Sequence, residues 1–163
     1  MNDRLRTISP IDGRLIVERP LASAAEASLV VDAAARAQQE FRRLSLDERA
    51  TLLEAFVQAV EADRDRISEE LTLQMGRPIR YSPGEVRGFA ERARCMIDLG
   101  REALRDLPLA PKESFHRFIE RVPLGVVLVL SPWNYPWLTA VNAVVPALMS
   151  GNAVVLKHSD QTP

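Results

Sequence analysis

The chain has 163 residues, of which 47% are hydrophobic, and its 21 basic and 22 acidic residues leave a formal net charge of −1. This composition predicts one folded domain with an ordinary core and argues against a disordered chain. Because charges of both signs are mixed along the chain, we expect no nucleic-acid-binding surface and no membrane-binding surface.

Cysteine content and apolar segments further limit the classes of protein to which the chain can belong. The single cysteine, Cys95, excludes an internal disulfide, and with two histidines and no C-x-x-C motif the sequence predicts no metal site. The charged N-terminus lacks the apolar region of a signal peptide. Prolines and a glycine divide the apolar tract 122–156 into pieces shorter than the ~20 residues that a membrane span needs. We therefore expect a soluble, cytoplasmic protein.

The first part of the chain predicts a hairpin followed by helices. Residues 6–19, RTISPIDGRLIVER, are typical of two strands joined by a turn at PIDG. Three S-x-x-E motifs then predict helix starts with capping boxes, at Ser23 with Glu26, Ser45 with Glu48, and Ser82 with Glu85. Apolar periodicity extends the helices over 24–43, over 46–75 with a break near Asp63, and over 83–104.

Two of these helices carry residues that we expect in the core. On the second, five apolar residues share one face at helical spacing: Leu52, Leu53, Phe56, Val57 and Val60. On the third lies Cys95, which as a lone helical cysteine is expected to be a buried packing residue rather than a nucleophile.

After Leu104 the pattern changes to linkers and strands. RDLPLAPKES, with two prolines and no periodicity, predicts a linker, and the following SFHRFIERV is a short, half-polar strand candidate. Aliphatic runs at 125–130 and 153–156 flank a helix over 136–149, in which Pro146 is expected to cause a kink or a restart. Aliphatic strands without alternation are typical of parallel sheets covered on both faces, so this segment predicts a right-handed βαβ unit.

Polar residues follow both strands of this unit, where open parallel sheets bind ligands. Pro132, Trp133 and Asn134 come after the first strand, and Lys157 and Asp160 after the second. A flat apolar wall, a cation and an acid together suit a dinucleotide. Each also has a plain structural explanation, for example Asn134 as a turn former, and no G-x-G-x-x-G, Walker A or G-x-S-x-G motif is present.

A longer pattern identifies a family. PLGVVLVLSPWNYP, followed by PALMSGNAVVLKHSDQTP, resembles the N-terminal half of the nicotinamide-binding domain of the aldehyde dehydrogenase superfamily, and ISPIDGRLI, LSLDERATLLEAF and ELTLQMGRPI are similar to its entry hairpin and helices. The resemblance covers essentially the whole chain. It implies an α/β fold in which residues 1–163 form the N-terminal part of a Rossmann-like NAD(P)-binding domain, with the catalytic domain absent. It also implies that 112–124 contains an oligomerisation strand, giving homodimers or homotetramers.

The resemblance also implies roles for individual residues. Asn134 matches the oxyanion-hole asparagine, whose side-chain amide stabilises charge on the aldehyde oxygen. The strand end that lies along the cofactor is matched by Leu130, Ser131, Pro132 and Trp133. Lys157 and Asp160 match the residues that contact the adenosine ribose, and Ser159 stands where members of the family can contact a 2′-phosphate. The implied cofactor is NAD, with NADP possible. Where the family has Lys-Pro, this sequence has Lys157-His158.

The implied activity is NAD(P)-dependent oxidation of a small aldehyde to a carboxylic acid through a cysteine thiohemiacetal and thioester. The family's nucleophile and its glutamate base come later in the chain, so the 163-residue chain alone is expected to be inactive. Two alternatives stay open: a CoA-acylating aldehyde dehydrogenase, and a non-catalytic truncated product that acts only in assembly.

Overall fold

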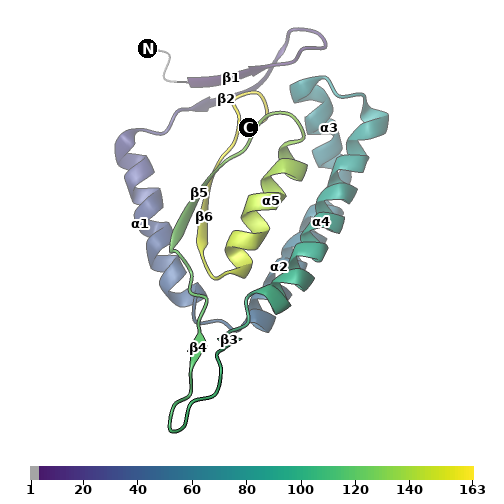
Figure 1. Cartoon of the computed structure of the whole chain (residues 1–163). Helices are drawn as coiled ribbons and strands as arrows, with labels where there is room; N and C mark the ends of the chain where they lie inside the picture. The colour runs from purple at the N-terminus through teal and green to yellow at the C-terminus, as the bar shows by residue number, and fades with distance from the viewer. Residues whose placement is uncertain (1–3) are drawn as a thin grey trace.

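The computed structural model describes residues 4–163 (Figure 1). The chain begins with the predicted hairpin, in which β1 (Arg4–Ile8) pairs antiparallel with β2 (Leu15–Pro20). The hairpin docks at two points. The Thr7 hydroxyl donates to the backbone carbonyl of Asp160 at 2.8 Å, and Pro10 lies so close to Gly76 that a Cβ there would be 3.0 Å from the proline ring.

Three helices follow: α1 (Ala24–Phe41), α2 (Leu46–Ala62) and α3 (Arg64–Met75). The predicted capping boxes at Ser23 and Ser45 are both present, with each serine accepting from the backbone N–H three residues on and each glutamate accepting in return. Capping satisfies amides that the helix itself leaves without partners. The break predicted near Asp63 is confirmed, because α2 and α3 meet there.

The third capping box is wrong. A short 3₁₀ turn, η1 (Ile79–Tyr81), leads directly into α4 (Ser82–Ala103), so that Ser82 already has helical backbone angles and Tyr81 holds the cap position. The Ser82 side chain is buried and lies 3.1 Å from the Thr72 hydroxyl of α3. Glu85 is thereby free to make contacts outside its own helix.

The core lies between α2, α3, α4 and α5 (Pro136–Met149). Of the predicted face of α2, Leu53, Val57 and Val60 are buried, whereas Leu52 is 51% and Phe56 38% exposed. The prediction was therefore too wide, because only the central stripe of α2 faces its neighbours. The Phe56 ring still meets Phe89 of α4 edge-on, with 5.7 Å between centroids.

Cys95 is exposed, and the prediction that it packs in the core is wrong. The buried stripe of α4 includes Phe89, Ala93 and Ile97. Cys95 lies two residues from both Ala93 and Ile97, which is about 200° around a helix of 3.6 residues per turn. Its place on the helix, rather than its residue type, decides its exposure.

After α4 the chain forms a projecting arm, seen at the bottom of Figure 1. The arm contains only two-residue strands, β3 (Leu107–Pro108) paired antiparallel with β4 (Phe118–Ile119). Strand structure inside the predicted SFHRFIERV segment is thus confined to its centre, and the predicted linker supplies its partner. Apolar side chains on the arm are exposed, including Phe115, Phe118 and Ile119.

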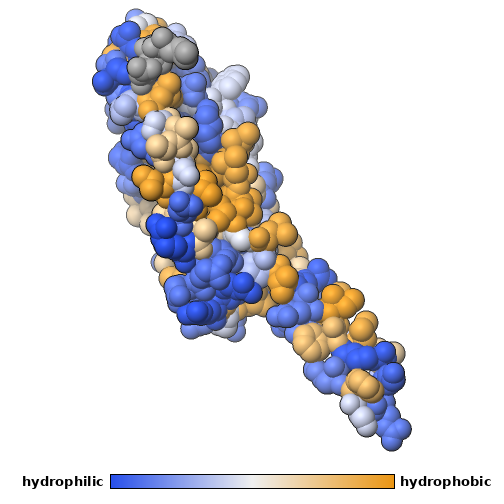
Figure 2. Space-filling view, turned by 90° about the vertical axis from the view of Figure 1, so that its left-hand side faces the viewer, coloured by the Kyte–Doolittle hydropathy of each residue, from blue (hydrophilic) through white to orange (hydrophobic). Residues whose placement is uncertain are grey.

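The last segment forms the predicted βαβ unit. Strands β5 (Val126–Leu130) and β6 (Ala153–Lys157) pair in parallel and α5 connects them, running through Pro146 without the expected restart. Figure 1 shows α1 on one side of the strands and α5 on the other. The helices do not cover the two strands completely, since Leu128 is 63% and Leu156 48% exposed. Figure 2 shows apolar side chains along the α1 face of the molecule.

The turn between α5 and β6 is held from three sides. The N–H of Asn152 donates to the carbonyl of Ala147 at 3.0 Å, and Gly151 has a left-handed φ of 82°, as in a Schellman cap. Gln38 of α1 donates to the Gly151 carbonyl at 3.0 Å, while Arg49 of α2 donates to the carbonyl of Met149 at 3.2 Å.

None of the helices over residues 4–163 has the length and apolar character that a membrane span requires.

Candidate functional site

The carboxyl ends of β5 and β6 meet at one edge of the sheet. Leu130 and Lys157 are register partners at the two strand ends, and the N–H of Ser131 donates to the carbonyl of Lys157 at 2.9 Å. The two connections that leave these strands therefore start side by side. All the residues predicted to bind a cofactor or an aldehyde oxygen lie in these strand ends and connections, at the end of the molecule where the C-terminus lies in Figure 1.

The first connection, residues 131–135, is a turn in which the Asn134 side chain takes no part in the hydrogen bonding. Tyr135 has left-handed backbone angles (φ 54°, ψ 55°) and precedes the first residue of α5. Its carbonyl accepts from the Thr139 hydroxyl at 2.8 Å, and the Ser131 hydroxyl donates to the carbonyl of Pro136 at 3.2 Å. The Asn134 side chain is exposed and makes no hydrogen bond to the turn within residues 4–163. The turn is thus shaped by its neighbours, and the amide is left available.

The second connection presents a charged pair. Lys157 Nζ and Asp160 Oδ1 lie 3.1 Å apart, with the two side chains 61% and 73% exposed. The Ser159 hydroxyl accepts from the N–H of Gln161 at 3.2 Å, which turns it toward the backbone. His158, in place of the family's proline, contacts the Ser159 carbonyl through Nδ1 at 2.9 Å. Lys157 and Asp160 are therefore paired at the surface, and the Ser159 hydroxyl is engaged by the backbone.

Glu85 is a site residue that the sequence analysis missed. Its side chain is fully buried, and Oε1 accepts from the backbone N–H of Trp137 at 3.0 Å in the first turn of α5. Its other oxygen pairs with Arg77, whose guanidinium lies 4.5 Å from the ring centroid of Tyr135. An anion at a helix N-terminus and a cation over the adjoining tyrosine fix both sides of the turn that carries Asn134.

Burial raises the pKa of the Glu85 carboxyl above its ordinary value, although the Trp137 N–H and the Arg77 guanidinium act in the opposite direction. A signal for this residue was present in the sequence. Glu85 falls on the same helical stripe as Phe89 and Ala93, so an acid stands where periodicity predicts a core position. The S-x-x-E motif concealed it by suggesting a local role.

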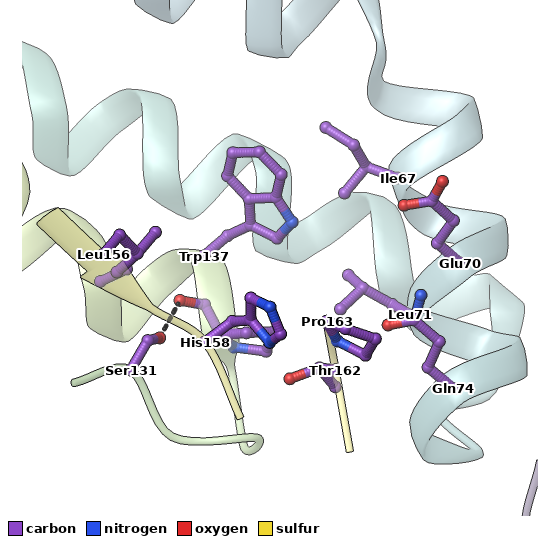
Figure 3. Close-up of a pocket in the computed structure, with 12 residues that line it drawn as sticks. Ile67, Glu70, Leu71, Gln74, Ser131, Trp137, Leu156, His158, Thr162 and Pro163 are labelled. Atoms are coloured by element: carbon purple, nitrogen blue, oxygen red, sulfur yellow. Dashed lines mark hydrogen bonds between the residues drawn. The ribbon is translucent and has the colours of Figure 1, made fainter. Parts of the chain in front are cut away.

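A cavity of about 220 Å³ lies between α3, α5 and the end of β6. Figure 3 shows the side chains that surround it, among them Ile67, Trp137 and Leu156. Of the predicted site residues, Ser131 alone lines it. This largely apolar gap is therefore distinct from the exposed surface that Asn134, Lys157 and Asp160 share.

The exposed residues at the strand ends fit a dinucleotide. Leu130 is 68% and Trp133 52% exposed, which gives an apolar surface beside the Lys157–Asp160 pair. An apolar wall, a cation and an acceptor for ribose hydroxyls are the groups that such a cofactor needs. Within residues 4–163, no group of three or more His, Cys, Asp or Glu side chains is placed to hold a metal ion. The fold and site together define part of a nucleotide-binding α/β domain.

Comparison with known proteins places the chain in a family. The model of the aldehyde dehydrogenase family matches residues 1–163, and the chain belongs to this family. A 3,6-anhydro-alpha-L-galactose dehydrogenase of Streptomyces coelicolor is 34% identical over 159 residues, which is 98% of this chain and 32% of that protein. The chain thus spans about a third of the length of such relatives.

Solved structures agree in fold. An NADP-dependent glyceraldehyde-3-phosphate dehydrogenase of Bacillus halodurans, complexed with NADP, has a TM-score of 0.89 and 30% identity, with 99% of this chain and 35% of that chain covered. An NAD-dependent benzaldehyde dehydrogenase of Corynebacterium glutamicum has a TM-score of 0.90 and 28% identity, with the same coverage of 99% and 35%. The predicted α/β class and the partial Rossmann-like domain are confirmed, and relatives use NAD or NADP.

Proposed function

We infer that this chain is the N-terminal part of an NAD(P)-dependent aldehyde dehydrogenase subunit that oxidises an aldehyde to a carboxylic acid. The observation that carries this proposal is the free amide of Asn134. It stands in a turn whose shape is set by Ser131, Tyr135 and Thr139, so the asparagine is not needed to form it. An available donor on a fixed backbone is what an oxyanion site requires.

Asn134 would act on the oxygen of the aldehyde. In the proposed reaction a cysteine thiolate from outside this chain attacks the carbonyl carbon, and negative charge develops on the oxygen. The Asn134 amide donates to that oxygen more strongly in the transition state than in the ground state, and therefore lowers the barrier. Glu85 and Arg77 act as positioning residues, because they hold the turn and the first turn of α5.

The cofactor would lie over the ends of β5 and β6. NAD(P), when bound, accepts the hydride from the substrate carbon. Leu130, Pro132 and Trp133 would give the apolar surface beneath it, and Lys157 and Asp160 would contact its ribose hydroxyls. Because a carboxylate repels a 2′-phosphate, Asp160 favours NAD over NADP, while Ser159 next to it offers a hydroxyl where a phosphate would sit.

The proposal is tested by substituting Asn134 in the complete subunit. Asn134→Ala should lower kcat by about 10² to 10³ while cofactor affinity and melting temperature stay near their original values. Asn134→Asp should not restore activity, because its carboxylate repels the developing charge. Gln58→Ala removes an exposed amide from α2 and serves as the control. An active Asp variant beside a destabilised Ala variant would show that Asn134 only shapes the turn.

Segment 112–124 of the projecting arm would carry subunit contacts. Its short strands leave Phe115, Phe118 and Ile119 exposed, and Figure 2 shows apolar side chains on the arm at the lower right. Exposed apolar side chains beside unpaired strand edges favour pairing with a second subunit. We expect dimers or tetramers by light scattering, and changing Phe118 and Ile119 to serine should shift them toward monomers. A complete protein that is monomeric before any change would contradict this role.

A further inference from the structure

The backbone of Tyr135, the residue between Asn134 and the first residue of α5, is strained. Its φ of 54° and ψ of 55° lie in the left-handed region, which bulky L-residues rarely adopt. Among the other non-glycine residues that the structure describes, only Ser114 has a positive φ, and it lies in the tight turn closed by the bond from the Phe115 N–H to the Lys112 carbonyl. A bulky residue in this conformation needs a contact that holds it there.

Tyr135 has an alternative conformation that its place in the chain favours. It occupies the N-cap position of α5, where residues ordinarily have extended backbone angles. Ser23 and Ser45 cap α1 and α2 in that way, with ψ angles of 164° and 163°. The following residue, Pro136, also favours extended angles at Tyr135. An extended Tyr135 would change the direction in which the chain enters α5 and would turn Asn134 away from its present place.

Hydrogen bonding of the backbone does not explain the left-handed angles. The carbonyl of Tyr135 accepts from the N–H of Thr139 at 2.8 Å, which is the first bond of α5. Ser23, whose angles are extended, makes the same bond at the start of α1, where its carbonyl accepts from the N–H of Ala27 at 2.9 Å. The bond is therefore compatible with an extended cap residue, and the side chain of Tyr135 must account for the difference.

The contact that holds this side chain is made by Arg77. Its guanidinium lies 4.5 Å from the centroid of the tyrosine ring, within the range of a cation–π interaction. Arg77 is itself held in place, because it is only 15% exposed and pairs with the fully buried Glu85. Tyr135 is 47% exposed, and its hydroxyl has no hydrogen-bond partner within residues 4–163. The anchored arginine therefore fixes a ring that has little other support.

We infer that Tyr135 is a positioning residue, whose left-handed backbone, held by Arg77, aims the Asn134 amide at the oxygen of the aldehyde. The inference rests on the proposed function of Asn134. Loss of the ring contact releases Tyr135 to the extended conformation, in which the amide is turned away. Turnover then falls while the aldehyde and the cofactor still bind, because the ring acts through the backbone and not through contact with the substrate.

Substitutions at position 135 of the complete subunit test this inference. Tyr135→Leu removes the ring contact and keeps a bulky side chain, so it should lower kcat about tenfold with KM within about twofold. Tyr135→Asn also removes the ring, but asparagine tolerates left-handed angles, so kcat should stay within about threefold of the original value. Tyr81→Leu is the matched control, since the Tyr81 ring lies 4.8 Å from Arg80 but its φ is −102°, and kcat should not change.

A paired change in the anchor gives a second test. Arg77→Met combined with Glu85→Gln removes the cation without leaving a buried charge unpaired. With tyrosine at position 135, the pair should lower kcat about tenfold. In the Tyr135→Asn background the further loss should stay below about twofold, since the backbone there no longer depends on the arginine. Equal losses in both backgrounds would mean that Arg77 acts by another route and would overturn the inference.

Crystal structures of the variants separate this inference from the proposed reaction. The φ of residue 135 should be negative in Tyr135→Leu and positive in Tyr135→Asn. If the unaltered subunit oxidises no aldehyde, the proposed reaction fails, while these angles still decide whether the ring holds the backbone. A positive φ in both variants overturns the inference, as does an equal loss of kcat in both. A raised KM with unaltered kcat in both variants would assign the ring to substrate binding and would overturn it as well.

Discussion

Glu85 offers the sharpest test of how the turn before α5 is held. In Glu85→Ala, the partly buried N–H of Trp137 loses its acceptor at 3.0 Å, and Arg77 loses the carboxylate with which it pairs. An unsatisfied buried donor costs about 1–3 kcal/mol. Arg77 is 15% exposed and keeps some contact with water, so the cost of leaving its charge unpaired lies at the low end of this range. We expect Glu85→Ala to lower the free energy of unfolding by about 3 kcal/mol.

Glu85→Gln should behave differently. Glutamine keeps the shape and one acceptor oxygen for the Trp137 N–H, and it removes a charge whose burial is unfavourable. Arg77 still loses its counter-charge, and removing one partner of a buried ion pair is destabilising, so the expected cost is about 1 to 2 kcal/mol. Gln should therefore be less damaging than Ala, because it keeps an acceptor for the Trp137 N–H and removes a buried charge.

The dependence on pH has a definite sign. Because burial raises the pKa of Glu85 in the folded protein, the folded state binds this proton more tightly than the unfolded state. The contribution of Glu85 to stability is therefore largest below its unfolded pKa and falls as pH rises through its folded pKa. Glu85→Gln should lack this fall.

Urea unfolding of the complete subunit, followed at several pH values, measures all three effects, with kcat recorded alongside. Glu54→Ala is the matched control, since Glu54 pairs with Arg94 at 2.9 Å with both side chains more than a third exposed, and it should cost less than about 1 kcal/mol. If Gln is as damaging as Ala, the charge itself stabilises the fold and the reasoning from burial is refuted.

Three further outcomes are expected. Gly100→Ala places a Cβ 2.6 Å from Cγ of the buried Met149, so it should cost about 1–2 kcal/mol in urea unfolding, whereas Gly84→Ala on the same helix meets no such contact and should be neutral or stabilising. Cys95 is exposed and lies outside the site, so alkylating it or changing it to serine should leave turnover intact; lost turnover in the serine variant would make it a functional residue. Asp160→Ser removes the acid that pairs with a lysine at 3.1 Å and should raise NADP efficiency relative to NAD, while an unchanged ratio would remove Asp160 from the ribose site.

What the sequence could predict was decided by short-range patterns. The hairpin and the caps at Ser23 and Ser45 depend on residues close together in sequence, and each strand of the parallel pair was predicted from its own short aliphatic run; all are confirmed. The capping box at Ser82 used the same rule and failed, because the preceding 3₁₀ turn replaced the cap. Local patterns are sufficient only where no neighbouring element supplies a competing contact.

Long-range contacts account for what was missed. Glu85 bonds a backbone N–H 52 residues away, and nothing near it in sequence marks that partner. The exposure of Cys95 and Leu52 depends on which stripe of each helix meets its neighbours. The roles of Asn134, Lys157 and Asp160 came from family resemblance and stay predictions, although the structure brings their two connections to one edge.

The bond between Thr7 and the carbonyl of Asp160 joins residues 153 positions apart, and this has a consequence for the order in which the protein is made. A ribosome adding about 5–20 residues per second needs about 8 to 30 s to cover those 153 positions. During that interval the newborn hairpin can rest on α3 through Pro10 and Gly76, but its second anchor does not yet exist. Within residues 4–163, the first strands to be synthesised are therefore among the last to be secured, and a slow codon stretch before residue 160 would prolong the period in which a protease can reach them.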